Sequence, residues 1–166
     1  AIDLHKISEK EQKFIYSHFL KIPSMINHIL NPDTGYISIL GEAVSPKSQE
    51  RIGYLPEERG LYKKMKVFDQ LMYLAQLKGL SQMAAKKAIE FWLDRFEASS
   101  WKKKEVSELS KGMSQKIQFI ATVAHDPEIY IFDEPFSGLD PINSEMLKEV
   151  ILEEKKQGKT ILFSTH

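Results

Sequence analysis

The sequence predicts an α/β fold, and three neighbouring patterns support this prediction. The apolar run 129–132 has strand character and ends abruptly in Asp133, Glu134 and a proline, so both carboxylates fall at the carboxyl end of a strand. Before it, Ser110 and Gly112 open a segment whose apolar residues recur at helical spacing. After it, a Ser-Gly-Leu-Asp turn delivers a proline to the first position of another helix. Because open α/β sheets place their chemistry at the carboxyl ends of strands, this stretch is the candidate site.

The first thirty residues are the least informative part of the sequence. Residues 2–20 mix charged and apolar side chains in a pattern closer to a helix than to a strand, and Pro23 interrupts it. Residues 29–35 have the pattern of a helix end followed by a Pro-Asp turn. Residues 36–40 alternate as a short strand before a glycine.

Two amphipathic helices are predicted in the middle of the chain and one more strand at its end. Residues 67–79 form the first helix, and residues 81–96 form the second, with Ser81 as its N-cap. The apolar run 160–163 predicts the last strand, and Gly158 before it is interpreted as the glycine cap of a preceding helix.

The composition of the chain excludes several kinds of site and partner. The 166 residues are enough for one core, so one domain is the default expectation. The 23 basic and 23 acidic residues cancel, which leaves no net field to attract nucleic acid or anionic lipid. The absence of cysteine excludes a disulfide framework and a thiolate metal site, and it fits the cytosol. Apolar runs of about four or five residues are far shorter than the ~20 that span a bilayer, so a membrane role requires a partner.

Four motifs, in this order, resemble those of the ATP-binding-cassette (ABC) ATPases. Residues 109–113, LSKGM, resemble the signature motif of that family, which is usually LSGGQ. Residues 129–135, IYIFDEP, resemble its Walker B strand with the catalytic glutamate, and residues 137–140, SGLD, resemble its D-loop. The terminal Ser-Thr-His, residues 164–166, resembles its switch histidine. The resemblance covers residues 29–166 and implies a P-loop NTPase-like core with a helical subdomain at about 60–125.

The phosphate-binding loop of that family is not found in the sequence. It needs Gly-x4-Gly-Lys-Ser/Thr, so that glycine backbones approach the phosphates, the lysine reaches them and the hydroxyl holds Mg²⁺. The family spacing places its lysine at about residue 19 and its hydroxyl near residue 20, within residues 13–20, KFIYSHFL, which hold no glycine. Gly158-Lys159-Thr160 is a decoy, because it lacks the upstream glycine and lies between a helix and a strand in the wrong order. We therefore expect residues 1–28 to replace the Walker A region, with the fold incomplete at the N-terminus and truncated after the switch histidine.

The resemblance implies a role for each site residue. Asp133 suits Mg²⁺ or its water shell, Glu134 the general base that activates water, and His166 a donor to the γ-phosphate. Ser110 and Gly112 serve the ATP that a second subunit holds, in a head-to-tail dimer with two composite sites. A glycine at the third signature position is replaced here by a lysine, and a glutamine at the fifth by a methionine, both interpreted as tolerated variants.

Two further positions belong to the nucleotide region by the same resemblance. Glu57 stands where the Q-loop usually has glutamine, a variant typical of ABC proteins of the sodium- and drug-exporter type. Asp140 ends the D-loop. The alternatives remain a solvated acid for Glu57 and a solvated surface for the lysine run 102–104. Aromatic and apolar residues at 61–68 are interpreted mostly as core, and otherwise as a surface that receives a membrane subunit.

The function implied is the ATP-binding subunit of an ABC transporter. It binds and hydrolyses ATP with Mg²⁺, dimerises with a second nucleotide-binding subunit, and lies in the cytoplasm against the inner face of the cell membrane through transmembrane permease subunits. The first alternative is a non-hydrolytic or degenerate subunit that contributes only its signature motif to a partner's site. The second, a soluble ABC ATPase of DNA repair or translation, is disfavoured by the neutral charge and the single cassette.

Overall fold

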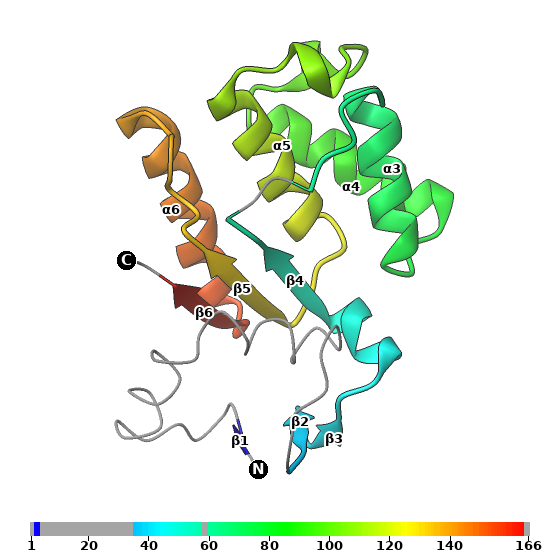
Figure 1. The fold of residues 1–166 in the computed structure, drawn as a ribbon, viewed down its shortest axis with the longest axis vertical. Helices are drawn as coiled ribbons and strands as arrows, with labels where there is room; N and C mark the ends of the chain where they lie inside the picture. The colour runs from blue at the N-terminus through cyan, green and yellow to red at the C-terminus, as the bar shows by residue number, and fades with distance from the viewer. Residues whose placement is uncertain (1, 4–34, 58–59, 165–166) are drawn as a thin grey trace. The chain divides into compact units, whose positions relative to one another are not determined.

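A computed structural model describes residues 2–3, 35–57 and 60–164 of the chain (Figure 1). The chain divides into two compact units, residues 1–52 and 53–166, and each is described by itself. The predictions for residues 4–34, which include the helix within 2–20 and the helix end at 29–34, lie outside the described residues.

The first unit contains a small three-stranded sheet. Its strands are β1 (Ile2–Asp3), β2 (Ile37–Ile39) and β3 (Glu42–Ala43), in the order β1-β2-β3. β1 runs parallel to β2, while β2 and β3 form an antiparallel hairpin. The two residues of its turn, Leu40 and Gly41, have φ values of 52° and 83°, which the tightest hairpin turns require. The strand predicted at 36–40 is confirmed, and a 3-10 helix, η1 (Pro46–Arg51), follows the hairpin.

The second unit is built on a sheet in the order β4-β5-β6. Its strands are β4 (Ile52–Leu55), β5 (Ile129–Asp133) and β6 (Thr160–Ser164). β5 and β6 run parallel, with Ile129 opposite Thr160 and Asp133 opposite Ser164. Every residue of β5 is buried, as expected for the central strand of a parallel sheet covered on both faces. The strand predicted at 129–132 is confirmed, and Asp133 lies at its carboxyl end.

Helices connect the strands of this sheet (Figure 1). The helices are α3 (Val67–Leu77), α4 (Gln82–Arg95), α5 (Lys111–Val123) and α6 (Pro141–Lys156), with short 3-10 turns η2 (Ser99–Trp101) and η3 (Val106–Glu108). The two predicted amphipathic helices correspond to α3 and α4. Among the described residues, no helix is both long enough and apolar enough to cross a membrane.

Predicted helix ends match the structure closely. The Ser81 hydroxyl caps α4 by accepting from the backbone N–H of Ala84 at 3.3 Å. Gly158, with a φ of 89°, follows the C-cap of α6, and the N–H of Lys159 donates to the Glu154 carbonyl at 3.2 Å. This is the hydrogen-bond pattern of a glycine-terminated helix, so the interpretation of Gly158 as a cap is confirmed.

The lysine run 102–104 has a structural function that its charge does not reveal. The backbone carbonyls of Lys104 and Lys102 accept hydrogen bonds from the N–H groups of Val67 and Phe68, at 2.9 and 3.1 Å. These N–H groups belong to the first turn of α3, which has no side-chain cap. The loop therefore satisfies the start of α3 through its backbone, while its side chains are half-buried or exposed.

An aromatic series joins the helices to the sheet. The rings of Phe96, Phe119 and Phe132, from α4, α5 and β5, follow one another at centroid distances of 5.5 Å, and all three side chains are buried. Phe132 also stacks on Tyr130 at 5.5 Å. Burying each such side chain contributes about 1.5–3 kcal/mol, so this series is a main source of stability at the base of the candidate site.

Candidate functional site

The carboxyl end of β5 holds two of the predicted site residues side by side. Asp133 is 9% exposed, and Glu134, just beyond the strand, is half-buried. Glu134 has a φ of 46°, in the left-handed region that residues other than glycine rarely adopt. Such a conformation costs on the order of 1–3 kcal/mol and persists only where surrounding structure enforces it. Strained residues of this kind gather at functional sites, so the observation agrees with the role predicted for Glu134.

The charge of Asp133 affects the neighbouring strand. Burial in the first place, and the negative charge of Asp133 in the second, raise the pKa of the Tyr54 hydroxyl on β4. Tyr54 therefore stays protonated, as a potential hydrogen-bond donor, at the edge of the sheet where Asp133 lies. The carboxyl ends of β4 and β5 thus form one polar edge.

The signature segment begins helix α5, as predicted. Ser110 is the N-cap, and its hydroxyl accepts a hydrogen bond from the Met113 N–H at 3.2 Å. Ser110 and Lys111 are exposed, so the first turn of the helix presents backbone N–H groups and the positive end of its dipole at the surface. A methyl group at Gly112 would meet its nearest neighbours, in Gly138 and Leu139, only at 3.9 Å. Packing within the described residues therefore does not require glycine at 112.

The D-loop segment lies against the start of α5. Gly138 has a φ of 76°, and a methyl group built on it would lie 2.4 Å from Cε of Lys111, so that lysine side chain passes directly over the glycine. Asp140 is the N-cap of α6 and accepts from the Asn143 N–H at 2.9 Å and from Asn143 Nδ2 at 2.5 Å. The hydrogen bond from the Asn143 backbone is the main cause that lowers the pKa of Asp140. Asp140 thus keeps its charge and fixes the end of this turn.

Glu57 is exposed in a bend that follows β4. The residue before it, Pro56, accepts a hydrogen bond through its carbonyl from Nε2 of Gln118 on α5, at 3.2 Å. The structure therefore ties the Q-loop segment to the same helix that begins with Ser110.

The predicted residues meet around helix α5, with one exception. The helix contacts the turn before Asp140 through Gly112, and the turn after Glu134 through Gln115, whose Nε2 donates to the Pro135 carbonyl at 3.2 Å. His166 lies outside the described residues.

The described residues contain no group of three or more His, Asp or Glu side chains that gathers to hold a metal ion. Asp133 supplies a single buried carboxylate. That donor set fits Mg²⁺, which keeps several waters and takes one or two protein carboxylates together with phosphate oxygens.

Three residues near the site were not predicted. The resemblance predicts Lys111 only as a tolerated variant, yet its side chain packs over Gly138. Gln115 and Gln118 were not singled out, although each is buried and hydrogen-bonded to a loop backbone. The sequence feature that could identify them is a pair of side-chain amides three residues apart, in a helix that also buries several apolar residues.

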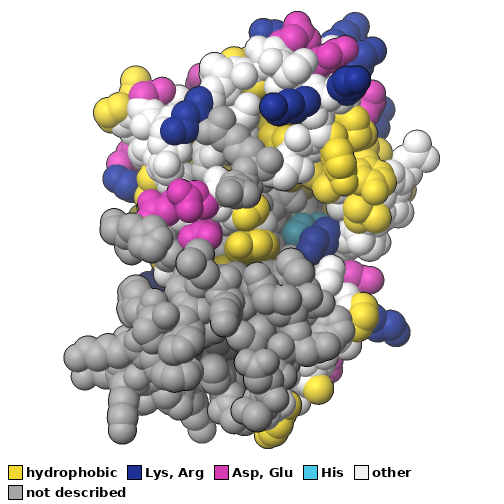
Figure 2. All heavy atoms as spheres, in the orientation of Figure 1, with side chains coloured by type: hydrophobic (Ala, Val, Ile, Leu, Met, Phe, Trp, Pro, Cys, Tyr) yellow, Lys and Arg dark blue, Asp and Glu magenta, His cyan; other side chains and the backbone are white. Residues whose placement is uncertain are grey.

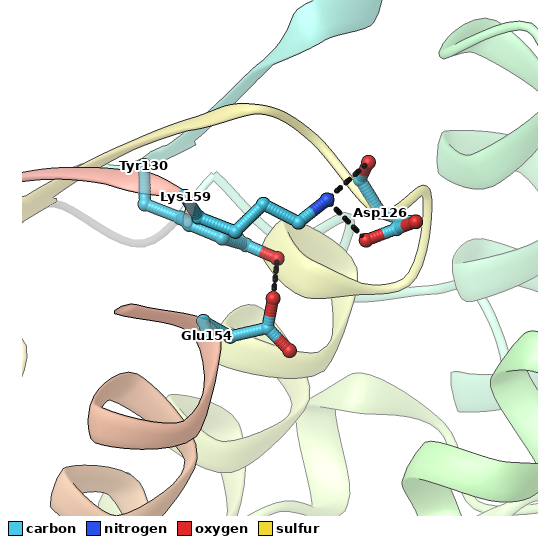
Figure 3. Close-up of polar contacts among 4 residues, drawn as sticks. All are labelled: Asp126, Tyr130, Glu154 and Lys159. Carbon is cyan, nitrogen blue, oxygen red and sulfur yellow. Dashed lines mark hydrogen bonds and ion pairs between the residues drawn. The ribbon is translucent and has the colours of Figure 1, made fainter. Parts of the chain in front are cut away.

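A second polar cluster lies at the opposite end of β5 (Figure 3). The Tyr130 hydroxyl donates to Oε2 of Glu154 at 3.0 Å, and both side chains are buried. Lys159 forms an ion pair with Asp126, Nζ to Oδ1 at 2.6 Å, and also donates to its backbone carbonyl at 3.3 Å. Lys159 therefore has a structural partner, which agrees with the interpretation of residues 158–160 as a decoy.

Comparison with known proteins gives consistent matches. Residues 21–137 match the family model described as ABC transporter. The chain is 54% identical over 142 residues to YhaQ of Bacillus subtilis, named as an uncharacterized ABC transporter ATP-binding protein, with 86% of the chain and 48% of YhaQ covered. It is 38% identical over 146 residues to the ABC transporter ATP-binding protein NatA of the same organism, covering 86% of the chain and 59% of NatA. The chain thus spans about half the length of these relatives.

Solved structures of ATP-binding cassettes also match this chain. An ATP-binding subunit of an ABC transporter matches 90% of the chain and 64% of its own length at 31% identity, with a TM-score of 0.83. An ATP-binding cassette solved as a dimer bound to ADP and Pi matches 90% of the chain and 70% of its own length with a TM-score of 0.80. Its sequence identity is 19%, so this second likeness concerns the fold alone.

Proposed function

This chain belongs to the ABC transporter family of ATP-binding proteins, and on that premise we propose that it acts as an ATP-binding subunit that hydrolyses ATP to move a substrate through separate membrane subunits. The observation that supports this function most is the end of β5. There, buried Asp133 is followed by Glu134 in a left-handed conformation, and the next residue, Pro135, is hydrogen-bonded to Gln115 of α5.

The chemistry follows from the residues. Hydrolysis of a phosphoanhydride requires charge neutralisation on the phosphates and a group that orients or deprotonates the attacking water. Asp133 would hold Mg²⁺ or its waters, and the bound ion would neutralise phosphate charge. Glu134 would accept the proton of the attacking water, and His166 would donate to the γ-phosphate. Glu57 would contact the same region from the end of β4.

The start of α5 would serve a second subunit. Its exposed N–H groups and the Ser110 hydroxyl are suited to a phosphate held by the partner, because a helix N-terminus attracts anions. Gly112, which packing within the described residues does not require, would allow the close approach of that phosphate. Asp140 and its turn would lie at the same interface.

A second candidate function has its own supporting observation. None of the 166 residues forms a Gly-x4-Gly-Lys-Ser/Thr motif. In this function the subunit hydrolyses nothing itself and contributes only Ser110 and Gly112 to the site of an intact partner.

An exposed apolar patch is the proposed contact with the membrane subunits. Tyr62, Tyr73 and Leu77 are 55%, 45% and 62% exposed, and the two tyrosine rings pack edge to face at 6.3 Å. Figure 2 shows hydrophobic side chains gathered over α3. Of the apolar residues at 61–68, which are predicted to be mostly core, Leu61 and Phe68 pack partly buried against the core, whereas the ring of Tyr62 lies at the surface. Through this patch the subunit would attach to the inner face of the membrane.

The test mixes the chain with full-length YhaQ of Bacillus subtilis, in which the signature serine and glycine are replaced so that its homodimers are silent. We expect MgATP-dependent association and the appearance of ATPase activity, because this chain would complete the partner's site. Association without activity would contradict the proposed role of the signature segment in either candidate function.

A further inference from the structure

Helix α5 buries two glutamines that lie three residues apart, and therefore on neighbouring positions of one side. Gln115 and Gln118 are 3% and 5% exposed. Each directs its Nε2 to the backbone carbonyl of a proline at 3.2 Å: Gln115 to Pro135 and Gln118 to Pro56.

The two proline carbonyls occupy equivalent places in the fold. Pro135 follows Glu134 at the carboxyl end of β5, and Pro56 precedes Glu57 at the carboxyl end of β4. Both lie one peptide bond from a residue placed in the nucleotide region. One helix therefore holds two neighbouring strand ends by the same type of contact.

Thr122 extends this row by one more turn. Its hydroxyl lies 3.4 Å from the Tyr54 carbonyl of β4 and donates at 3.0 Å to the Gln118 carbonyl of its own helix. The end of β4 is thus attached to α5 at Tyr54 and at Pro56, whereas the turn after β5 is attached through Gln115.

Removing the hydrogen bonds from these glutamines would cost free energy. Most buried side-chain amides are hydrogen-bonded, and a buried carbonyl that loses its donor keeps its desolvation penalty. Pro135 has no N–H, so the turn after Asp133 has one backbone donor fewer with which to fix itself. The strained φ of Glu134, 46°, must be enforced by its surroundings, and the hydrogen bond from Gln115 acts on the very next residue.

We propose that Gln115 and Gln118 are positioning residues, which fix the backbones of Glu134 and Glu57 relative to the helix that begins with Ser110 and Gly112. This inference rests on the proposed function. Neither glutamine touches the reacting atoms. Each acts through the backbone carbonyl of a proline. Together they keep Glu134, Glu57 and the start of α5 in one fixed arrangement.

The first experiment needs no enzymatic activity. Gln115→Met keeps the length of the side chain but cannot donate a hydrogen bond to the Pro135 carbonyl. Amide hydrogen exchange of the wild type and of this variant is followed by NMR in the 166-residue chain. The amides of Ser137 and Leu139, which bond to the carbonyls of Glu134 and Phe136 at 3.1 and 3.2 Å, should exchange roughly tenfold faster. Amides inside β5 should be unchanged, and exposed Gln76→Met on α3 is the matched control.

The second experiment measures turnover in a version of the chain given a phosphate loop, because Glu134 and Glu57 would serve the nucleotide that their own chain holds. Gln115→Met should lower kcat roughly tenfold or more with KM for ATP unchanged, because a small misplacement of catalytic groups slows the reaction without weakening binding. Gln118→Met should have a similar effect through Pro56, and it supplies a second variant if Gln115→Met fails to fold. Gln76→Met should change neither constant.

The outcomes distinguish a failure of the positioning role from a failure of the proposed function. Faster exchange at Ser137 and Leu139 together with a selective fall in kcat supports the positioning role. Unchanged exchange, or faster exchange with an unchanged kcat in the variant while the loop-restored wild type turns over, overturns the positioning role alone. A loop-restored wild type that binds but never hydrolyses ATP overturns the proposed function, and with it the catalytic role of these contacts.

Discussion

The hydrogen bond between Tyr130 and Glu154 allows a stability change to be worked out from the structure. Tyr130 is fully buried, Glu154 is 7% exposed, and the hydroxyl lies 3.0 Å from the carboxylate oxygen. Tyr130→Phe removes only the hydroxyl and leaves a buried carboxylate without this donor. Hydrogen bonds to charged groups contribute about 1.5–3 kcal/mol, so we expect the free energy of unfolding to fall by about 2 kcal/mol.

The assay is urea denaturation of the 166-residue chain followed by circular dichroism, with the m-value as a check that compactness is unchanged. For a domain of this size, the loss corresponds to a fall in Tm of about 4–8 °C. Glu154→Leu should also destabilise the fold, but the double variant should recover at least about 1 kcal/mol relative to the sum, since neither partner then remains buried alone. Additive losses, or a loss below about 0.5 kcal/mol for Tyr130→Phe, would refute the reasoning.

The same pair predicts a dependence on alkaline pH. Burial first, then the charge of Glu154 and the hydrogen bond to it, raise the pKa of Tyr130 above its ordinary value of 10.0. Above about pH 10 the unfolded chain releases this proton while the folded chain keeps it. The stabilisation is therefore fully present below pH 10 and is lost as the pH rises further. Tyr130→Phe should show a shallower decline of stability than the wild type between roughly pH 10 and 11.5.

Three further predictions concern single positions. Glu97 ends α4 with a φ of 54°, so Glu97→Gly should raise the free energy of unfolding by about 0.5–1 kcal/mol, whereas Lys87→Gly within the same helix should lower it by about 1 kcal/mol, as measured by urea titration. Gln70 is fully buried and its amide has no hydrogen-bond partner among the described residues, so Gln70→Leu should stabilise the fold by about 1 kcal/mol, and a loss on titration would contradict this. In a version of the chain given a phosphate loop, Glu134→Gln should keep ATP binding in calorimetry but reduce turnover by ~10²-fold or more, and unchanged turnover would remove Glu134 from the role of base.

Local sequence patterns were sufficient for the elements that end in a recognisable residue. Ser81 is the N-cap that the sequence predicts, Ser110 and Asp140 cap the helices predicted to begin beside them, and Gly158 ends α6. The strand that ends at Asp133 was equally clear, because an apolar run followed by charge and proline leaves few alternatives. These features depend on a few adjacent residues.

Features that depend on distant residues were not predictable. The backbone carbonyls of the lysine run cap α3, and a lysine run by itself indicates only an exposed surface. Glu97 occupies a left-handed position where glycine is usual, and the N–H of the next residue, Ala98, donates to the Leu93 carbonyl at 2.8 Å. The partners of Gln115 and Gln118 lie 20 and 62 residues away, so only the folded chain identifies them.

The central claim is that Ser110 and Gly112 serve a partner's nucleotide, whereas Asp133 and Glu134 serve a nucleotide held by their own chain. The most direct measurement is steady-state ATPase activity of the mixture with the signature-silenced relative, carried out with two variants of this chain. Gly112→Asp should abolish the activity, because a carboxylate at the start of α5 repels the phosphate. Glu134→Gln should change it little. Activity that survives Gly112→Asp, or that disappears equally with Glu134→Gln, would contradict the account.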